Sequence, residues 1–396
     1  MNKERLWTKD FITIAAINFF IALVFYLLMV TIAPYAIDKF QASTSVAGFV
    51  SGIFILGALS GRIVAGRIVE ELGRKKLLIV SLVFFFVTTT FYFGAINFPL
   101  LVITRLLHGF AFGAVTTVTG TIIAHIIPNH RRGEGIGYFS MSAILATALG
   151  PFVGIFLSQH ADYNIIFIFT SLLSAICLVI AFMFREPAAN VPVQPQAKSF
   201  KNFQISNFLE FSVIPISIVV LFISFSYSGV LTFMSFYTKQ INLAEASRLF
   251  FLVYAISVFV SRPFSGKLFD AKGANIVVYP SLLIYAISML VFSQVNQGIT
   301  LLIAGSLMGL GYGNFTLSAL AISLKLAPRH RLGLATSTFY VFFDIGFAIG
   351  PYIFGFLIPY TGCRGLYLSM VAVILVAIVF YYFLLGRKVT LQSTIQ

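Results

Sequence analysis

The sequence predicts an all-α membrane protein with twelve transmembrane helices, arranged as two six-helix bundles related by a parallel pseudo-twofold axis. Of its 396 residues, 59% are hydrophobic and only 10% are charged, which is too little polar surface for a water-soluble domain of this size. Long apolar stretches recur along the whole chain. Motifs of the first half also return in the second half at a fixed offset of 200 residues.

The apolar stretches are each long enough to cross a hydrocarbon layer about 30 Å thick. Lipid offers the backbone no hydrogen-bond partner, so each stretch is expected to form a continuous helix. The first is too long for a cleavable signal peptide and is expected to remain as a helix. The predicted spans, of about 20 to 28 residues each, begin at Phe11, Ser45, Leu77, Leu100, Gly135, Asn164, Phe211, Ala246, Asn275, Ile299, Gly333 and Gly365.

Positive charge is concentrated in alternate short loops between the spans. The formal net charge is +14, and the basic residues at span ends follow the positive-inside pattern of a membrane protein. We therefore expect a multi-pass protein of the plasma membrane with both termini in the cytoplasm, and no nucleic-acid partner. The two cysteines, Cys177 and Cys363, suggest neither a metal site nor a disulfide framework, and we expect no metal and no cofactor.

The duplication runs through polar and glycine positions, where chance matches are rare. Because the offset spans six helices, both halves enter the membrane with the same orientation. The matched positions are Arg62 with Arg262, Gly66 with Gly266, Gly73 with Gly273, Gly109 with Gly309, Gly113 with Gly313, and Gly150 and Pro151 with Gly350 and Pro351.

The halves are predicted as an N-terminal bundle at residues 1–186 and a C-terminal bundle at residues 207–396. Residues 187–206 between them are polar and contain prolines, which predicts a cytoplasmic linker. Two rigid halves on a tether suit rocking about a shared site. Each chain holds both halves, so we expect a monomer.

The loop after the second span carries a motif that resembles a known family. Gly66, Glu70, Gly73 and Arg74 are spaced as in G-x-L-x-D-x-x-G-R, the signature loop of the major facilitator superfamily, and the resemblance covers essentially the whole chain. In that family the loop's carboxylate and arginine help to latch the cytoplasmic face. Loop charges that only set topology are the alternative. The second copy provides the corresponding gating residues Gly266, Asp270 and Gly273.

Arg105 and His108 in the fourth span resemble the R-x-x-Q-G motif of the drug and proton antiporter branch, with histidine in place of glutamine. A fixed cation at this depth costs about 3 kcal/mol or more unless a partner or water compensates it, which favours a functional role. His108 lies about one turn further along and can change charge near neutral pH. The alternative for His108 is a hydrogen bond to a neighbouring helix.

The fifth span is similar to the antiporter motif G-x8-G-x3-G-P-x-x-G-G of the same branch. Family members with this motif are mostly exporters, which favours efflux; the alternative is that small residues only allow close helix packing. The motif residues here are Gly137, Ala146, Gly150, Pro151 and Gly154, with Ala146 replacing a glycine.

Asp344 is the carboxylate that lies deep within an apolar span, which makes it the best candidate for a proton site. We expect Asp344, Arg105 and His108 to carry proton coupling. The alternative for Asp344 is a neutral acid bonded to a neighbouring helix.

The resemblance implies that the first and seventh spans help to line the substrate cavity. Aromatic faces there suit a lipophilic and even cationic compound, whereas serines can bond either a polar substrate or a carbonyl of their own helix. The candidate cavity residues are Asn18, Tyr26, Ser224, Tyr227, Phe233 and Tyr340.

These features predict a secondary active transporter that exports a small amphipathic compound, drug-like or a metabolite, by alternating access coupled to protons. Its expected partners are that substrate, protons and the lipid bilayer. An exporter of sugars or siderophore-like metabolites is the alternative. A membrane-embedded enzyme is disfavoured because the sequence has no paired acids, metal-spaced histidines or cysteine nucleophile with a base.

Overall fold

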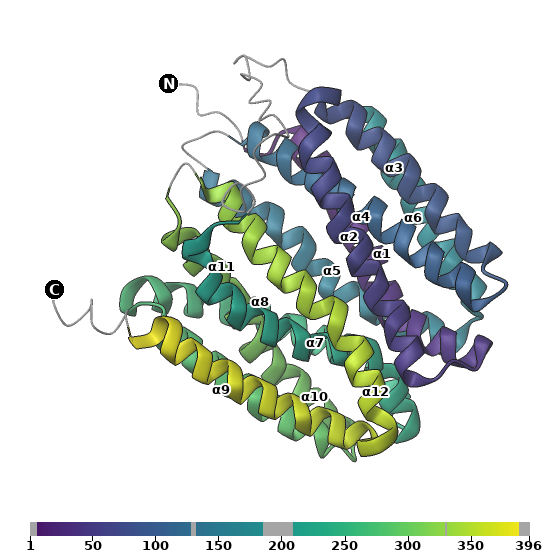
Figure 1. Cartoon of the computed structure of the whole chain (residues 1–396), viewed down its shortest axis with the longest axis vertical. Coiled ribbons are helices and arrows are strands. Elements are labelled where there is room, and N and C mark those ends of the chain that lie inside the picture. The colour runs from purple at the N-terminus through teal and green to yellow at the C-terminus, as the bar shows by residue number, and fades with distance from the viewer. Residues whose placement is uncertain (1–5, 128–131, 185–208, 329–330, 388–396) are drawn as a thin grey trace. The chain divides into compact units, whose positions relative to one another are not determined.

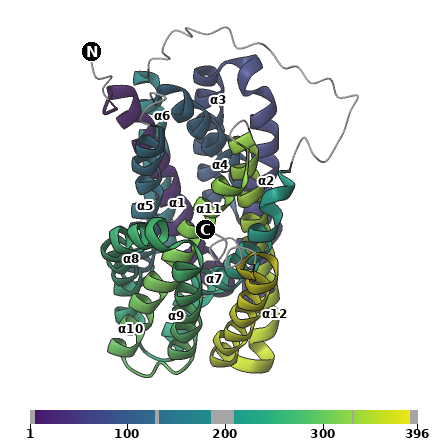
Figure 2. The ribbon, with the colours of Figure 1, turned by 90° about the vertical axis from the view of Figure 1, so that its left-hand side faces the viewer.

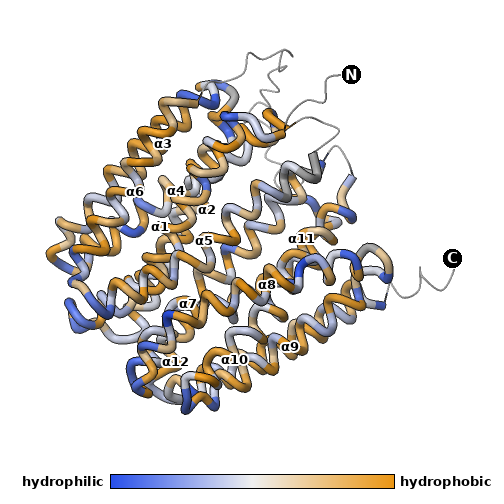
Figure 3. The backbone as a smooth tube through the Cα atoms, turned by 180° about the vertical axis from the view of Figure 1, so that it is seen from behind, coloured by the Kyte–Doolittle hydropathy of each residue, from blue (hydrophilic) through white to orange (hydrophobic). Residues whose placement is uncertain are grey.

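The computed structural model describes residues 6–127, 132–184, 209–328 and 331–387. Within these ranges every regular element is a helix and no strand occurs. Hydrophobic residues follow the lengths of the helices, and hydrophilic residues gather near their ends and in the connections (Figure 3). The structure therefore confirms the predicted all-α membrane class.

The chain divides into two compact units. Unit 1 comprises Met1–Gln41 and Ile53–Lys198, and unit 2 comprises Ala42–Gly52 and Ser199–Gln396. The predicted linker at residues 187–206 lies outside the described residues. The helices that begin in the first half are α1 (Lys9–Phe40), α2 (Thr44–Leu72), α3 (Arg74–Thr90), η1 (Phe91–Gly94), α4 (Phe98–Ile126), α5 (Arg132–His160) and α6 (Tyr163–Met183).

The second half repeats this order with two irregular insertions. A π-helix, η5, separates α10 from α11, and a second π-helix, η7, follows α12. The elements are η4 (Phe211–Val213), α7 (Ile214–Gln240), α8 (Ala244–Lys272), α9 (Asn275–Ser293), α10 (Gly298–Met308), η5 (Gly309–Gly313), α11 (Asn314–Leu326), α12 (Leu332–Tyr381) and η7 (Tyr382–Gly386).

Eleven helical stretches of the described chain are long and apolar enough to cross a membrane, and the last of them contains two crossings. It runs from Leu334 to Gly386 over 53 residues, about 80 Å of helix against a hydrocarbon layer of about 30 Å. Gly362 interrupts it with φ 68° and ψ 174°, a conformation that favours glycine. The green and yellow halves of α12 run in opposite directions in Figure 1. The structure thus accommodates the twelve predicted spans.

Glycines of the duplicated loop motif end α2 and α8. Gly73 and Gly273 have φ values of 82° and 86°, which L-residues with a side chain rarely adopt. The motif therefore specifies two helix ends at the same place in each half.

The helices of each unit pack in matching pairs. In unit 1, α1 packs against α5 and α3 packs against α4 and α6; in unit 2, α7 packs against α12, and α9 packs against α10 and α12 (Figure 2). A Cβ atom on Gly109 would lie 1.9 Å from the carbonyl oxygen of Phe54, and one on Gly309 would lie 2.4 Å from that of Tyr254. Both partners of the second contact lie 200 residues after those of the first, so the duplication extends to helix packing.

Candidate functional site

The fourth span buries two basic side chains one turn apart. Arg105 and His108 both lie on α4, and neither has any exposed surface. An arginine inside a helical bundle needs hydrogen-bond acceptors or polarisable surfaces around its guanidinium group. The structure supplies both from neighbouring elements of unit 1.

Tyr92 joins the two basic side chains. Arg105 Nη1 donates to the Tyr92 hydroxyl at 3.2 Å, and the same hydroxyl lies 3.0 Å from His108 Nδ1. The guanidinium carbon of Arg105 also lies 4.4 Å from the centre of the Phe54 ring, within cation–π range. Tyr92 belongs to η1, after α3, and Phe54 belongs to α2. Together with α4, which carries Arg105, three elements surround the charge.

The other side of the imidazole meets a chain of hydroxyl groups. His108 Nε2 lies 3.5 Å from Thr89 Oγ1, and Thr89 donates to the carbonyl oxygen of Phe85 at 2.6 Å. The Thr89 hydroxyl also lies 3.2 Å from that of Ser174 on α6. The resulting network connects α3, α4 and α6 and keeps a fixed positive charge inside unit 1. Sequence reasoning found Arg105 and His108 but missed Tyr92 and Thr89.

The predicted antiporter-motif helix, α5, packs closely against α1. A Cβ atom on Gly150 would lie 2.7 Å from the Tyr26 Cβ, and one on Gly154 would lie 2.8 Å from the Leu27 carbonyl oxygen. Ala146 and Pro151 are buried in the same helix, whereas the surroundings of Gly137 fall outside the described part. The small residues at these positions therefore allow α5 to approach α1 closely.

Asp344 is buried within α12, with 5% of its surface exposed. Its neighbours along the helix are aromatic: Phe343 and Phe347 stack with their ring centres 4.8 Å apart. Phe347 in turn contacts Tyr227 of α7 edge-on at 5.9 Å. The turn of α12 next to Asp344 therefore packs into an aromatic cluster of unit 2.

Four tyrosines from four elements make up the rest of this aromatic cluster. Tyr227 stacks on Tyr312 at 3.9 Å, and Tyr254 and Tyr285 lie 6.5 and 5.6 Å from Tyr312. Tyr312 belongs to η5, and π-helical turns often occur at functional sites. Sequence reasoning identified Tyr227 but missed Tyr312; the glycines at 309, 311 and 313 were the available signal for an irregular helix there.

The other predicted cavity residues differ in their surroundings. Asn18 donates to Ser142 Oγ at 2.9 Å, and the Ser224 hydroxyl donates to the Leu221 carbonyl oxygen at 3.1 Å. Phe233 is fully buried, whereas Tyr340 is 37% exposed. Ser224 thus shows the bond within its own helix that the sequence left as an alternative.

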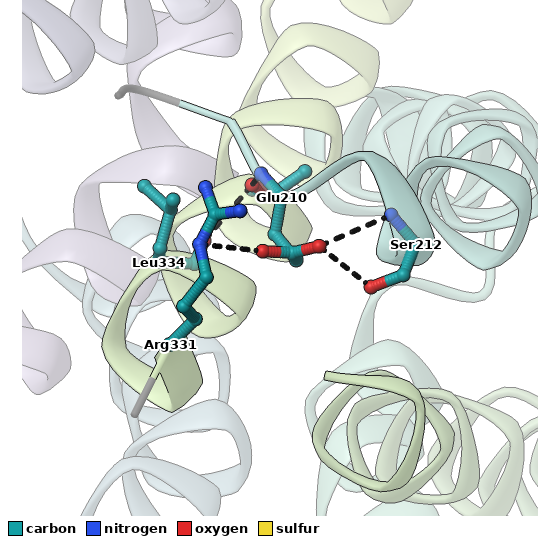
Figure 4. Close-up of polar contacts among 5 residues, drawn as sticks. Glu210, Ser212, Arg331 and Leu334 are labelled. Carbon is teal, nitrogen blue, oxygen red and sulfur yellow. Dashed lines mark hydrogen bonds and ion pairs between the residues drawn. The ribbon is translucent and has the colours of Figure 1, made fainter. Parts of the chain in front are cut away.

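A buried acid near the start of α7 is tied to the start of α12 (Figure 4). Glu210 Oε2 lies 2.9 Å from Arg331 Nε, and Glu210 Oε1 accepts hydrogen bonds from the backbone and hydroxyl of Ser212 at 3.3 and 2.8 Å. The Glu210 backbone donates to Thr338 Oγ1 at 2.8 Å. We call this group the Glu210 clamp. It joins two helices of unit 2, and sequence reasoning did not predict it.

The structure describes only part of the two loops that the sequence predicts to act in gating. Gly73 ends α2 and Arg74 begins α3, and Gly66 and Gly266 lie within α2 and α8. The side chains of Glu70 and Asp270 lie outside the described residues. Across the described chain, no group of three His, Cys, Asp or Glu residues is placed to hold a metal ion.

Comparison with known proteins agrees with this architecture. The sequence matches the family described as Major Facilitator Superfamily over residues 14–296 and 249–395. It is 26% identical over 388 residues to an uncharacterised transporter of that type from Methanocaldococcus jannaschii, covering 95% of this chain and 96% of the relative. The multi-drug resistance efflux pump PmrA of Streptococcus pneumoniae is 23% identical over 362 residues, covering 88% of this chain and 87% of the pump.

A solved structure shares the fold. The bacterial homologue of the human lysosomal transporter Spinster, in an inward-facing and unoccupied conformation, superposes with a TM-score of 0.78. The two sequences are 15% identical, and the match covers 96% of this chain and 97% of the other.

Proposed function

This chain belongs to the Major Facilitator Superfamily, and from that premise we propose that it exports small amphipathic compounds in exchange for protons by alternating access. The family and the fold are those of membrane transporters and not of enzymes. The direction of transport is supported by the similarity to PmrA, whose name describes a multi-drug resistance efflux pump.

The observation that carries the proposal is the burial of Asp344 in α12. An ionisable group inside a transmembrane helix is expensive, and such groups usually mark ion or proton pathways. Asp344 is 5% exposed in an otherwise apolar run. We assign it as the proton carrier, which binds a proton from one side and releases it as the substrate passes.

Arg105 and His108 are the second part of the proposed coupling. Arg105 provides a fixed positive charge within unit 1, and His108 shares the Tyr92 hydroxyl with it. Breaking a hydrogen bond of this network would change the energy of the buried positive charge. We therefore assign both residues to proton coupling.

An amphipathic substrate fits the side chains better than a sugar or a siderophore-like metabolite does. A polar substrate needs several hydroxyl and amide groups that can turn towards it. Thr116, Thr117, Ser224 and Ser228 instead donate to carbonyl oxygens three or four residues earlier in their own helices. Aromatic rings dominate around Tyr227, which suits dispersion and cation–π contacts.

We further propose that the moving halves are residues 1–186 and 207–396, joined by the linker at residues 187–206. The proposal includes a plasma-membrane location with both termini in the cytoplasm, which the positive-inside pattern supports. Because one chain holds both halves, a monomer is sufficient for transport.

The test uses proteoliposomes that hold the purified protein and a pH-sensitive dye. The vesicles are challenged in turn with lipophilic cations, sugars and metallophores, and protein-free vesicles serve as the control. We expect lipophilic cations to evoke proton movement and the other two classes to evoke none. Substrate movement without proton movement would contradict antiport, and a response to sugars or metallophores alone would contradict the substrate class.

A further inference from the structure

The hydrogen bonds around Tyr92 have only one consistent direction. An arginine side chain can donate but cannot accept, so the Tyr92 oxygen accepts from Arg105 Nη1. The tyrosine hydroxyl has one hydrogen of its own. Across the described chain, His108 Nδ1 is the other polar group near this oxygen, at 3.0 Å. The hydroxyl therefore donates to Nδ1, which must carry a lone pair.

The same counting fixes the second nitrogen of the imidazole. A neutral histidine whose Nδ1 accepts carries its hydrogen on Nε2. That Nε2 hydrogen points to Thr89 Oγ1 at 3.5 Å, and Thr89 can accept it because its own hydrogen goes to the Phe85 carbonyl oxygen at 2.6 Å. Donors and acceptors then alternate without conflict from Arg105 through Tyr92 and His108 to Thr89.

The opposite arrangement leaves a buried hydrogen without an acceptor. If His108 carried a hydrogen on Nδ1, that hydrogen would face the one on the Tyr92 hydroxyl. Tyr92 is 1% exposed and His108 is fully buried, so water cannot substitute for the lost acceptor. A buried hydroxyl without a partner is costly, and this disfavours both the other neutral tautomer and the charged imidazolium in this conformation.

We propose that Tyr92 is a positioning residue that holds His108 neutral, with its proton on Nε2, and thereby keeps the positive charge of the cluster on Arg105. Its role in coupling rests on the proposed proton antiport. His108 can bind a proton on Nδ1 only after the Tyr92 hydroxyl turns away. Tyr92 lies in η1 whereas Arg105 and His108 share α4, so a shift between these two elements would release the restraint.

The first test is nitrogen-15 NMR of the protein with labelled histidine at about pH 8, where an ordinary imidazole is neutral. The chain has five histidines, and His108→Gln identifies the signals of His108 by their loss. We expect protonated Nε2 and unprotonated Nδ1 in the wild type. Protonated Nδ1 of His108 in the wild type would overturn the proposal, whatever a transport assay shows.

The second test removes only the hydroxyl group. Tyr92→Phe keeps the ring that stacks on Phe167, and Tyr35→Phe is the matched control, since Tyr35 is buried in the same unit and bonds Lys39. We expect Tyr92→Phe, but not Tyr35→Phe, to mix the two His108 tautomers and to lower proton flux per substrate by about tenfold. An unchanged tautomer and flux in Tyr92→Phe would refute the positioning role. Absence of proton flux in the wild type would instead contradict the proposed antiport and leave the tautomer assignment standing.

Discussion

Replacing Gly109 with alanine should loosen the contact between α2 and α4. The two helices meet through small residues: a Cβ atom on Gly109 would lie 1.9 Å from the Phe54 carbonyl oxygen, and one on Gly113 would lie 1.9 Å from that of Ala58. Carbon and oxygen atoms that are not bonded normally stay about 3.3 Å apart or more. The obstructing atoms belong to the backbone, so a rotamer change cannot relieve the overlap and the helices must separate by about 1.4 Å.

The expected cost follows from two opposing effects. Adding a methyl group to a packed interface costs about 1–3 kcal/mol. Alanine recovers up to about 1 kcal/mol through its better helix propensity. With this gain subtracted in full, the net loss should be up to about 2 kcal/mol, which corresponds to a fall in Tm of up to about 8 °C for a unit of this size.

Thermal unfolding in detergent can be followed with a dye that fluoresces on reaction with thiols. Cys177 and Cys363 are both buried, and Cys177 lies in unit 1 together with α4 and the part of α2 that begins at Ile53. A Cys363→Ser background therefore makes Cys177 the reporter of the affected unit. Gly120→Ala is the matched control, because a Cβ atom there meets no atom within 4 Å outside its own helix. Equal Tm values for Gly109→Ala and Gly120→Ala would refute the reasoning.

Two further predictions concern unit 2. Glu210→Gln should destabilise the protein by about 1–2 kcal/mol, because it removes the charge that pairs with Arg331. The double variant with Glu210→Gln and Arg331→Gln should lose less stability than the sum of the two single variants. Strict additivity of their Tm shifts would contradict the Glu210 clamp. Gly273→Ala should cost about 1–3 kcal/mol of stability, because φ is 86° at this position. Gly266→Ala is the control and should not lower Tm, because Gly266 is a helical glycine with open space around it. Equal Tm values for these two variants would show that Gly273 needs no left-handed conformation.

Much of the fold could be predicted because hydropathy and glycine positions are local properties of the chain. The spans predicted to begin at Asn275 and Ile299 correspond to helices that begin at Asn275 and Gly298. The repeated motif glycines likewise become two helix ends with positive φ. One detail was less accessible: the helix from Leu332 to Tyr381 contains both final spans, and the reversal occurs at Gly362.

The contacts of the site could not be predicted, because they depend on how helices rotate against one another. The depth of Arg105 in an apolar span indicated that it needs partners. No spacing in the sequence connects Tyr92 to Arg105, since these residues come from different elements that meet only after packing. The same holds for the stack of Tyr312 on Tyr227, because Tyr312 lies in the π-helix η5 and Tyr227 lies in α7.

Several serines and glycines allowed two interpretations from sequence, a role in helix packing or a role in transport. The structure shows which atoms surround them. The hydroxyl of Ser228 donates to the Phe225 carbonyl oxygen, and a Cβ atom on Gly350 would lie 2.0 Å from the same hydroxyl oxygen. Glycines of α12 thus pack closely against serines of α7, as Gly150 of α5 packs closely against α1 in the other half. A glycine pattern alone cannot distinguish helix packing from a transport role.

The central claim, that Asp344 carries the exchanged proton, is tested most directly by comparing Asp344→Asn with wild type in proteoliposomes under an imposed pH gradient. Asp162→Asn is the matched control, since the same change is made at an exposed helix start. We predict that Asp344→Asn abolishes proton-driven accumulation of a lipophilic cation but retains exchange of that cation across the membrane without a gradient, while Asp162→Asn behaves as wild type. Proton-driven accumulation that persists in Asp344→Asn would contradict the claim.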